Sequence, residues 1–276
     1  MKLKHIPQLL GFNKRAKRYG YVVKEFNLQE HGLLRYAQWQ HPSESPKEIS
    51  HQTVAQHKSI ISEGDFCIDI GAHTGDTTLP MALAAGTAGL TLALEPNPYV
   101  FPVLEKNVRL NRDKTNIVPL LAAAAQAYGE MEFEYSDSGF CNGGRHENIS
   151  VLDHGHVFKL SVWGIDIAYE LQTDFAAHLP KLRFIKTDAE GYDLYILQTL
   201  KDIIREYKPY LKAEVYKKSS AAYRRELVVY LKEMGYAVYH IAEEPFITGV
   251  EVTTENVMDW KHYDVFCIPP NKPKPR

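Results

Sequence analysis

The sequence predicts an α/β fold in which helices cover both faces of a mostly parallel sheet. Short apolar strands alternate with helical segments from Phe66 onward, and this alternation is typical of a parallel sheet. One of these strands ends in a glycine-spaced turn, and the next ends in an acidic residue. We predict three parts in the 276-residue chain: an N-terminal extension over 1–60, a main domain over 61–270 and a tail over 271–276.

The N-terminal extension carries weaker signals than the main domain. Residues 19–23 predict a strand, 28–39 a strand or hairpin, and 48–61 a helix that leads into the main domain. Two roles remain open for the extension. It could cover the mouth of the functional site, or it could form the contact between copies in a homo-oligomer.

The run Phe66-Cys-Ile-Asp-Ile-Gly-Ala-His-Thr-Gly75 is the segment on which the prediction depends most. Its first residues predict a strand buried on both faces. Asp69 within that strand needs hydrogen-bond donors, because an unpaired buried carboxylate is costly. Gly71 and Gly75 allow a tight turn and a close approach of a ligand to the backbone. The helix expected over 74–85 has three candidate capping residues, Thr74, Asp76 and Thr77.

A second acidic residue, Glu95, closes the apolar strand over 90–94. Asn97 and Pro98 then give a helix-start signal, which predicts a helix over 99–110. An acidic residue about 20 positions beyond a glycine turn is placed to hydrogen-bond a nucleoside ribose. The turn lacks the third glycine that brings backbone amides against a pyrophosphate. The pattern therefore favours a nucleoside without phosphates over NAD or FAD.

The remaining elements continue the alternation with one interruption. The strand over 117–123 runs into small residues around Ala122, against which a flat adenine or a closely packed helix could lie. A β-hairpin and loop insertion follows near 129–162, because 129–135 alternates apolar and acidic residues and 157–162 is its expected partner. Its glycine-rich loop is either an acceptor-facing lid or an ordinary surface loop. The later elements are strands over 182–186, 210–215, 236–241 and 263–268, with helices over 192–200 and from Ser219 or Ser220 to Gly235.

These motifs resemble those of S-adenosylmethionine-dependent methyltransferases. Asp69-Ile-Gly71-Ala-His-Thr-Gly75 is similar to their first motif, and Glu95-Pro96-Asn97-Pro98 to their second acidic motif. Ile185-Lys-Thr-Asp188-Ala-Glu190-Gly191 resembles the Ile-Lys-x-Asp-x-Glu-Gly signature of the FkbM-type family, which is mostly associated with O-methylation.

The resemblance implies a Rossmann-like class I methyltransferase fold, with a seven-stranded sheet whose last strand inserts antiparallel to the others. It implies S-adenosyl-L-methionine as the cofactor and a hydroxyl of a sugar or other small-molecule acceptor as the methylated group. The residues that it assigns to cofactor binding are Asp69, Gly71, Ala72, His73, Thr74, Gly75, Glu95, Pro96, Asn97, Ala122 and Asp188.

Asp188 and Glu190 are the candidate catalytic residues. A neutral hydroxyl is a poor nucleophile and needs a base or a metal to remove its proton. Carboxylates crowded at one strand end can have a raised pKa, which makes a better base. In the alternative interpretation, Glu190 and Gly191 form a helix-start turn, and Asp193 complements the helix dipole.

The sequence contains no compact metal motif, and we predict no metal ligands. Glu214 ends a strand at the same edge as Asp188, and this pair is the one candidate for Mg²⁺. His146, His154 and His156 lack zinc spacing.

Composition narrows the class of partner and the location. A net charge of −2 without a basic stripe disfavours nucleic acid. No segment approaches transmembrane length, which disfavours a membrane. Three widely spaced cysteines indicate a reducing compartment, and we expect a cytoplasmic protein.

Two other functions remain open at this point. One is a nucleoside-binding or scaffolding protein on a methyltransferase fold without turnover, against which the presence of Asp188 and Glu190 argues mildly. The other is a nicotinamide-dependent oxidoreductase, against which the missing phosphate glycine argues.

Overall fold

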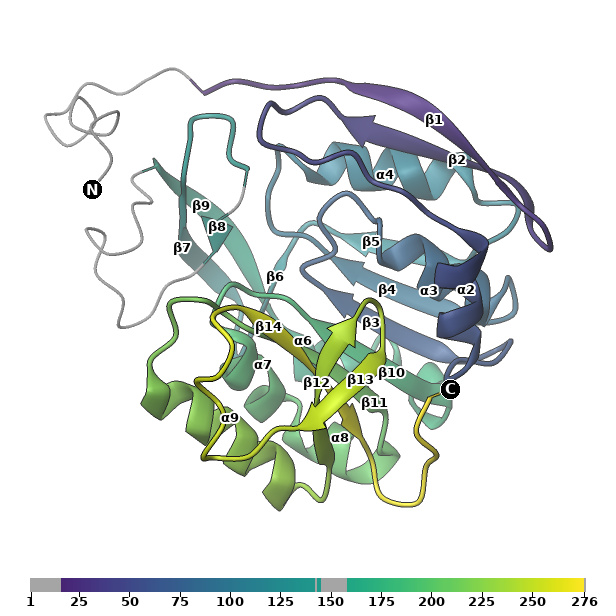
Figure 1. Ribbon diagram of the computed structural model, residues 1–276. Coiled ribbons are helices and arrows are strands. Elements are labelled where there is room, and N and C mark those ends of the chain that lie inside the picture. The colour runs from purple at the N-terminus through teal and green to yellow at the C-terminus, as the bar shows by residue number, and fades with distance from the viewer. Residues whose placement is uncertain (1–15, 142, 145–157, 276) are drawn as a thin grey trace, which may run out of the picture.

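The computed structural model describes residues 16–141, 143–144 and 158–275, and one large sheet organises the fold (Figure 1). The sheet has eight strands in the order β13-β12-β14-β11-β10-β3-β4-β5. Their bounds are β3 Phe66–Ile70, β4 Leu90–Leu94, β5 Ile117–Leu120, β10 Leu182–Thr187, β11 Tyr210–Val215, β12 Ala237–Glu243, β13 Ile247–Glu251 and β14 Tyr263–Ile268.

Strand direction in the sheet follows the prediction closely. Strands β5, β4, β3, β10 and β11 pair in parallel, and β14 lies antiparallel between β11 and β12. The expected antiparallel insertion of the last strand is therefore confirmed. The expected number of seven strands is wrong by one, because β13 adds an edge strand antiparallel to β12. Gly249 in the middle of β13 weakens its strand signal, which explains the omission.

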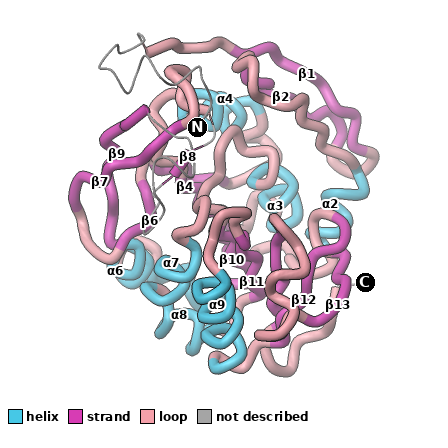
Figure 2. The backbone as a smooth tube through the Cα atoms, turned by 60° about the vertical axis from the view of Figure 1, so that its left-hand side comes forward, coloured by secondary structure: helices cyan, strands magenta, loops and turns pink. Residues whose placement is uncertain are grey.

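Helices cover both faces of this sheet. Their bounds are α2 His51–Lys58, α3 Thr78–Ala85, α4 Phe101–Leu110, α6 Ile167–Gln172, α7 Asp193–Thr199, α8 Lys201–Tyr207 and α9 Ala221–Glu233, with a 3₁₀ turn, η2, over Ala176–Lys181. Figure 2 shows α6 to α9 on one side of β10 and β11, and α2 and α3 on the other.

The alternation of side chains along β3 shows how one strand serves both faces. Phe66, Ile68 and Ile70 belong to the same core cluster as the buried leucines of α7 and α9. Cys67 belongs to the cluster on the opposite face, with Met81 of α3. Asp69 therefore also points toward the α3 face.

The N-terminal extension forms a two-stranded hairpin, β1 Tyr21–Leu28 and β2 Gly32–Trp39, which lies over α4 (Figure 1). Of the two alternatives for 28–39, the strand is confirmed as β2, and its hairpin partner β1 overlaps the strand predicted over 19–23. Asn107 of α4 is fully buried and accepts a hydrogen bond from the Ala37 amide at 2.5 Å. The Asn107 side-chain amide also donates to the Thr74 carbonyl at 2.7 Å. One side chain of α4 therefore ties the hairpin to the glycine turn.

The insertion forms a second, smaller sheet in the order β6-β9-β7-β8. Its strands are β6 Ala123–Ala125, β7 Gly129–Tyr135, β8 Gly143–Gly144 and β9 Phe158–Asp166. The predicted pairing of 129–135 with 157–162 is confirmed, since Tyr135 lies opposite Phe158 in an antiparallel register. The single strand predicted over 117–123 is wrong. The chain leaves the edge of the main sheet after Leu120, and β6 pairs with β9 instead.

Besides α2, which begins at His51 within the helix predicted over 48–61, two predicted helices begin later than expected. The helix expected over 74–85 begins at Thr78, and Thr77 makes no capping hydrogen bond. Thr74 instead hydrogen-bonds Tyr36 at 2.6 Å, and Asp76 pairs with Lys47 at 3.0 Å. The capping assignments of these three residues are therefore wrong.

The second late helix, α4, begins at Phe101, two residues after the predicted start. Asn97 still caps the turn that leads into it, because its side-chain oxygen accepts from the Tyr99 amide at 2.9 Å. No helix in the part of the chain that the structure describes is both long and apolar enough to cross a bilayer.

Candidate functional site

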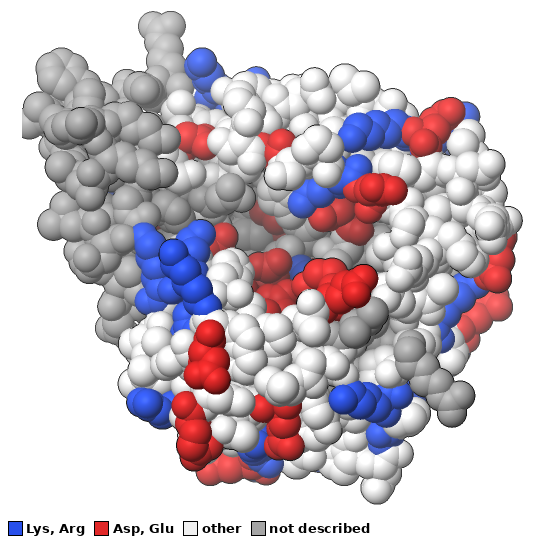
Figure 3. All heavy atoms as spheres, in the orientation of Figure 1, with Lys and Arg blue, Asp and Glu red and all other residues white. Residues whose placement is uncertain are grey.

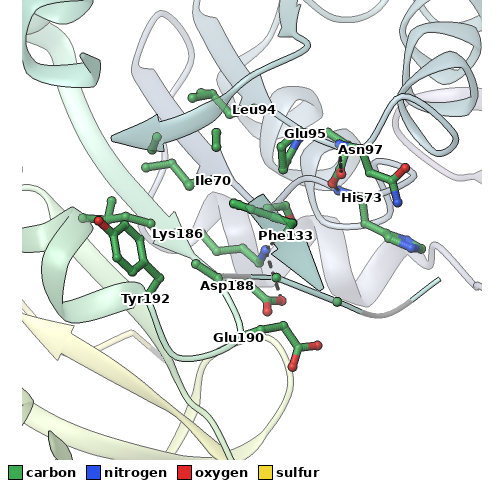
Figure 4. Close-up of a pocket in the computed structure, with 18 of the residues that line it drawn as sticks. Ile70, His73, Leu94, Glu95, Asn97, Phe133, Lys186, Asp188, Glu190 and Tyr192 are labelled. Atoms are coloured by element: carbon green, nitrogen blue, oxygen red, sulfur yellow. Dashed lines mark hydrogen bonds and ion pairs between the residues drawn. The ribbon is translucent and has the colours of Figure 1, made fainter. Parts of the chain in front are cut away.

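A cavity of about 260 Å³ lies where the carboxyl ends of β3, β4 and β10 meet (Figure 4). Parallel strands commonly bind ligands at this edge. In the space-filling view the face is hollowed near its centre, and acidic side chains gather around the hollow (Figure 3). Phe133 and Tyr135 of β7 also line the cavity, so the second sheet forms part of its wall.

The structure brings most of the predicted site residues to this cavity. Those that line it are Gly71, His73, Glu95, Pro96, Asn97, Ala122, Asp188 and Glu190. Four residues of the first motif do not line it: Asp69, Ala72, Thr74 and Gly75. Asp69 and Thr74 are fully buried beneath the cavity, where protein groups hydrogen-bond their side chains.

Asp69 and Lys186 form a buried ion pair below the cavity. The two residues lie opposite each other in the β3–β10 register, and Lys186 Nζ is 3.1 Å from Asp69 Oδ1. Thr78 of α3 donates its hydroxyl to the other Asp69 oxygen at 2.7 Å. Burial lowers the pKa of Lys186, but the carboxylates of Asp69 and Asp188 outweigh this effect and raise it. Lys186 therefore remains a cation at the base of the site.

Asp188 stands above Lys186 at the cavity rim. Its Oδ2 is 3.5 Å from Lys186 Nζ, and its side chain is 48% exposed (Figure 4). Its amide donates to the Ile70 carbonyl at 3.0 Å, which fixes the backbone beside the glycine turn. Gly71 has φ of +80°, and a Cβ at this position would collide with the Asp188 carbonyl oxygen. Glycine is required there by both conformation and space.

Glu95 presents a carboxylate that the backbone holds in place. Its two oxygens accept from the amides of His73 and Asn97, each at 2.8 Å. Burial raises the pKa of Glu95 to about 7, and the two amide hydrogen bonds act in the opposite direction. Each carboxylate oxygen has two lone pairs, so each can still accept a hydrogen bond from a ligand in the cavity.

His73 adopts a left-handed backbone conformation, with φ of +49°. This conformation directs its amide toward Glu95, and the ring points away from Asp188 and Glu190 (Figure 4). Burial lowers the pKa of His73 to about 4, so its imidazole is neutral at neutral pH.

Glu190 is the second carboxylate of the acidic rim, and it lines the cavity next to Asp188. Its φ is +51°, and burial together with the Asp188 charge raises its pKa to about 7. Asp193 is the first residue of α7 and is fully buried, and its Oδ2 accepts from the Ala189 amide at 3.4 Å. The helix-start interpretation is confirmed, because Glu190 and Gly191 form the turn before α7, and the side chain of Glu190 also faces the cavity.

The expected magnesium pair does not come together as a metal-binding group. Glu214 does not line the cavity, and its Oε1 pairs with His262 Nε2 at 3.0 Å. Burial raises the pKa of Glu214 well above its ordinary value. His146, His154 and His156 lie outside the described residues.

Comparison with protein families identifies the family of this chain. The sequence model described as "Methyltransferase FkbM domain" matches residues 69–238, which is more than half of the chain. This chain belongs to the FkbM methyltransferase family. The family is one of S-adenosylmethionine-dependent methyltransferases, and the matched segment contains all three motifs that line or support the cavity. No curated protein matches the sequence.

Solved structures similar to this FkbM-family chain are distant. A methyltransferase FkbM from Methylobacillus flagellatus KT is 16% identical with a TM-score of 0.47; the match covers 76% of this chain and 47% of that one, so this chain spans about half its length. Fibrillarin from Aeropyrum pernix, solved with natively bound S-adenosyl-L-methionine, is 13% identical with a TM-score of 0.43, over 93% of this chain and 100% of that one. With TM-scores below 0.5, these likenesses add nothing to the family assignment.

The sequence prediction for this FkbM-family domain missed the cavity residues that come from outside its motifs. Glu44 and Lys47 of the N-terminal extension line the cavity, and Lys47 pairs with Asp76 of the glycine turn. They lie in a segment without hydrophobic periodicity, so nothing in the sequence placed them. The only available signal was charge in a Pro/Ser-rich loop that precedes the first motif.

Proposed function

We propose that this chain is an S-adenosylmethionine-dependent O-methyltransferase that acts on a hydroxyl of a sugar or another small molecule. The observation that carries the proposal is the position of Glu95, Asp188 and Glu190 in one cavity. A carboxylate fixed by the backbone lies at the end of β4, and two side-chain carboxylates lie at the end of β10. The Glu95 carboxylate is placed to hydrogen-bond a nucleoside. The Asp188 and Glu190 carboxylates are placed to remove a proton from the acceptor hydroxyl.

The residues at the β4 end fit an adenosine group. Glu95 would accept hydrogen bonds from the ribose hydroxyls, since its oxygens retain lone pairs directed at the cavity. Leu94, Ala122 and Ile196 offer apolar surface for the adenine ring. Lys47 is a cation at this cavity and would pair with the carboxylate of the amino-acid group. When bound, the cofactor supplies an electrophilic methyl group on a sulfonium.

The residues at the β10 end would act on the acceptor. Asp188 is our first choice for the base that takes the hydroxyl proton, because its side chain is half-exposed and reaches the cavity. Lys186 positions that carboxylate through the ion pair at 3.5 Å. Glu190 is our second choice, and its pKa of about 7 would suit proton transfer near neutral pH. Phe133 and Tyr135 line the cavity from the second sheet and offer it apolar surface.

The acceptor and the cellular location are part of the same proposal. We propose a small-molecule or carbohydrate acceptor rather than nucleic acid, since the net charge is −2 and many of the side chains beside the hollow are acidic (Figure 3). A cytoplasmic location is consistent with the three separate buried cysteines.

Two measurements on the purified chain test this proposal. Calorimetric titration with S-adenosylhomocysteine should show binding, whereas NAD should show none. Labelled methyl transfer from S-adenosylmethionine should then appear with at least one member of a panel of hydroxylated sugars and small molecules. Absence of S-adenosylhomocysteine binding would overturn the cofactor assignment. Cofactor binding without transfer to any acceptor would favour a binding or scaffolding protein.

A further inference from the structure

Three potential metal ligands from distant parts of the chain meet beside the cavity. They are Glu44 of the N-terminal extension, His73 of the glycine turn and Cys141, which follows β7. Their ligand atoms all lie within 4.8 Å of one another. Glu44 Oε2 is 4.0 Å from His73 Nε2. This cluster lies apart from the Asp188 and Glu190 rim, because the His73 ring points away from both (Figure 4).

Hydrogen bonds within the described residues leave this cluster incompletely satisfied. His73 Nε2 and Glu44 Oε1 are buried atoms without a hydrogen-bond partner. The Glu44 side chain is only 5% exposed. Lys47 lies 3.6 Å from Glu44 Oε1, but its ammonium is closer to Asp76, at 3.0 Å. His73 Nε2 has no hydrogen-bond partner, and Glu44 Oε1 has only the longer ion pair with Lys47. Since buried polar atoms in proteins almost always have hydrogen-bond partners, these two atoms indicate that a ligand belongs between them.

The surrounding structure holds His73 and Cys141 in place. The backbone of His73 is fixed by its amide, which donates to Glu95, and its ring packs edge-on against Trp39 with centroids 5.9 Å apart. Cys141 is fully buried in a cluster that also contains Trp39. The Cys141 carbonyl accepts from the Ser136 hydroxyl at 3.1 Å. Such outer contacts orient ligands in known metal sites.

We propose that Glu44, His73 and Cys141 bind a divalent transition-metal ion, with zinc as the ion that this donor set favours. Thiolate and imidazole ligands select zinc over magnesium or calcium, and a carboxylate can complete such a set. Binding would transfer the Cys141 thiol proton to solvent as the sulfur–metal bond forms. Glu44 and His73 line the cavity, so the fourth position would face it.

The position of the ligands makes the metal a link between three segments of the chain. Glu44, His73 and Cys141 belong to the extension, the glycine turn and the insertion, which are joined otherwise by packing, hydrogen bonds and ion pairs such as Lys47–Asp76. A bound ion would link all three directly around the cavity. It would raise the melting temperature of the chain, because it binds the folded state and not a preformed site in the unfolded state. This inference does not depend on methyl transfer and holds for a binding protein as well.

The test uses the full untagged chain after removal of metals by a chelator. Addition of Zn²⁺ should raise the melting temperature and leave one zinc per chain by elemental analysis after desalting. Addition of Co²⁺ should produce the sulfur-to-cobalt charge-transfer absorption that reports a thiolate ligand. Cys141→Ala should abolish that absorption and weaken zinc binding by at least about 100-fold. The matched control is Cys267→Ala, which removes another fully buried thiol on β14 and should bind both metals normally.

A second variant separates ligand loss from misfolding. His73→Asn retains a residue type that tolerates the left-handed conformation, and it should weaken zinc binding while the circular dichroism spectrum stays unchanged. Failure of the native chain to bind Zn²⁺, or binding that Cys141→Ala and His73→Asn leave intact, would overturn the proposal.

Discussion

At the end of β4, two backbone amides hold the buried carboxylate of Glu95, whereas at the end of β10 the ammonium of Lys186 holds the half-exposed carboxylate of Asp188. The first arrangement does not depend on any neighbouring side chain, so its geometry is fixed. The second leaves a carboxylate open to exchange a proton with a ligand. The difference predicts that substitutions at the β4 end alter affinity for the cofactor, while those at the β10 end alter turnover.

The largest effect should come from Gly71, which contacts the end of β4 at Leu94 and the end of β10 at Asp188. Gly71→Ala should abolish cofactor binding and turnover together, because its methyl group would collide with the Asp188 carbonyl. The left-handed conformation alone should cost about 1–2 kcal/mol of folding stability. Titration with S-adenosylhomocysteine and urea denaturation measure the two effects. Gly20→Ala is the control, since no atom lies within 4 Å of the place that its methyl group would occupy; equal behaviour of the two variants would contradict the contact.

Asp188→Asn should be next in size and should separate turnover from binding. Loss of a general base lowers the rate by about 10²- to 10⁴-fold, and cofactor affinity should change little because the backbone contacts of Asp188 remain. The kcat for methyl transfer and the Kd for S-adenosylhomocysteine are the measurements. Asp202→Asn on α8, an exposed residue, is the control. Full activity in Asp188→Asn would remove its assignment as the base.

Glu95→Ala should show the opposite pattern. It removes the acceptor expected for the ribose hydroxyls, and a hydrogen bond to a charged group contributes about 1.5–3 kcal/mol, so affinity should fall about 10- to 100-fold. The kcat at saturating cofactor should be largely kept. Glu95→Gln retains one acceptor oxygen and should be intermediate. Unchanged affinity in both variants would exclude the ribose role.

The smallest effect concerns the pH dependence of stability at the β10 end. The folded pKa of Glu190 is about 7, above its ordinary value of 4.5, so the folded chain binds this proton more tightly than the unfolded chain. The contribution of Glu190 to the free energy of unfolding is therefore fully present below pH 4.5 and is lost as the pH rises through about 7. Glu190→Gln should remove this loss when urea denaturation is compared at pH 4.5 and pH 8. An unchanged pH profile would mean that Glu190 titrates normally.

The sequence predicted the parts of the site that depend on local signals. The strands β3, β4 and β10 and the carboxylates that follow β4 and β10 lie where their motifs indicated, because a strand and its first turn are encoded within a few residues. The prediction for Asp69 was less complete, since the motif gave its need for hydrogen bonds but not its side of the sheet. The alternation of side chains along β3 directs it to Lys186 and Thr78, below the cavity.

The parts that could not be predicted depend on contacts between distant segments. Glu44 and Lys47 reach the cavity only because the extension folds back over the glycine turn. The exit of the chain from the main sheet after Leu120 depends on the partner that β9 offers to β6. Neither feature has a periodic pattern in the sequence. Sequence analysis therefore assigns the segment of Glu44 and Lys47 to a loop, and extends the strand that ends at Leu120.

Asn107 joins the Ala37 amide, 70 residues earlier in the chain, to the carbonyl of Thr74. The hairpin is synthesised first, yet its hydrogen bonds to Asn107 cannot form until α4 has been made. Ordering of the glycine turn is therefore a late, non-local event that must overcome the entropy of closing a long loop. A variant without the Asn107 side-chain amide should refold slowly. It should reach a form in which the main sheet is complete but the glycine turn beside the cavity is not ordered.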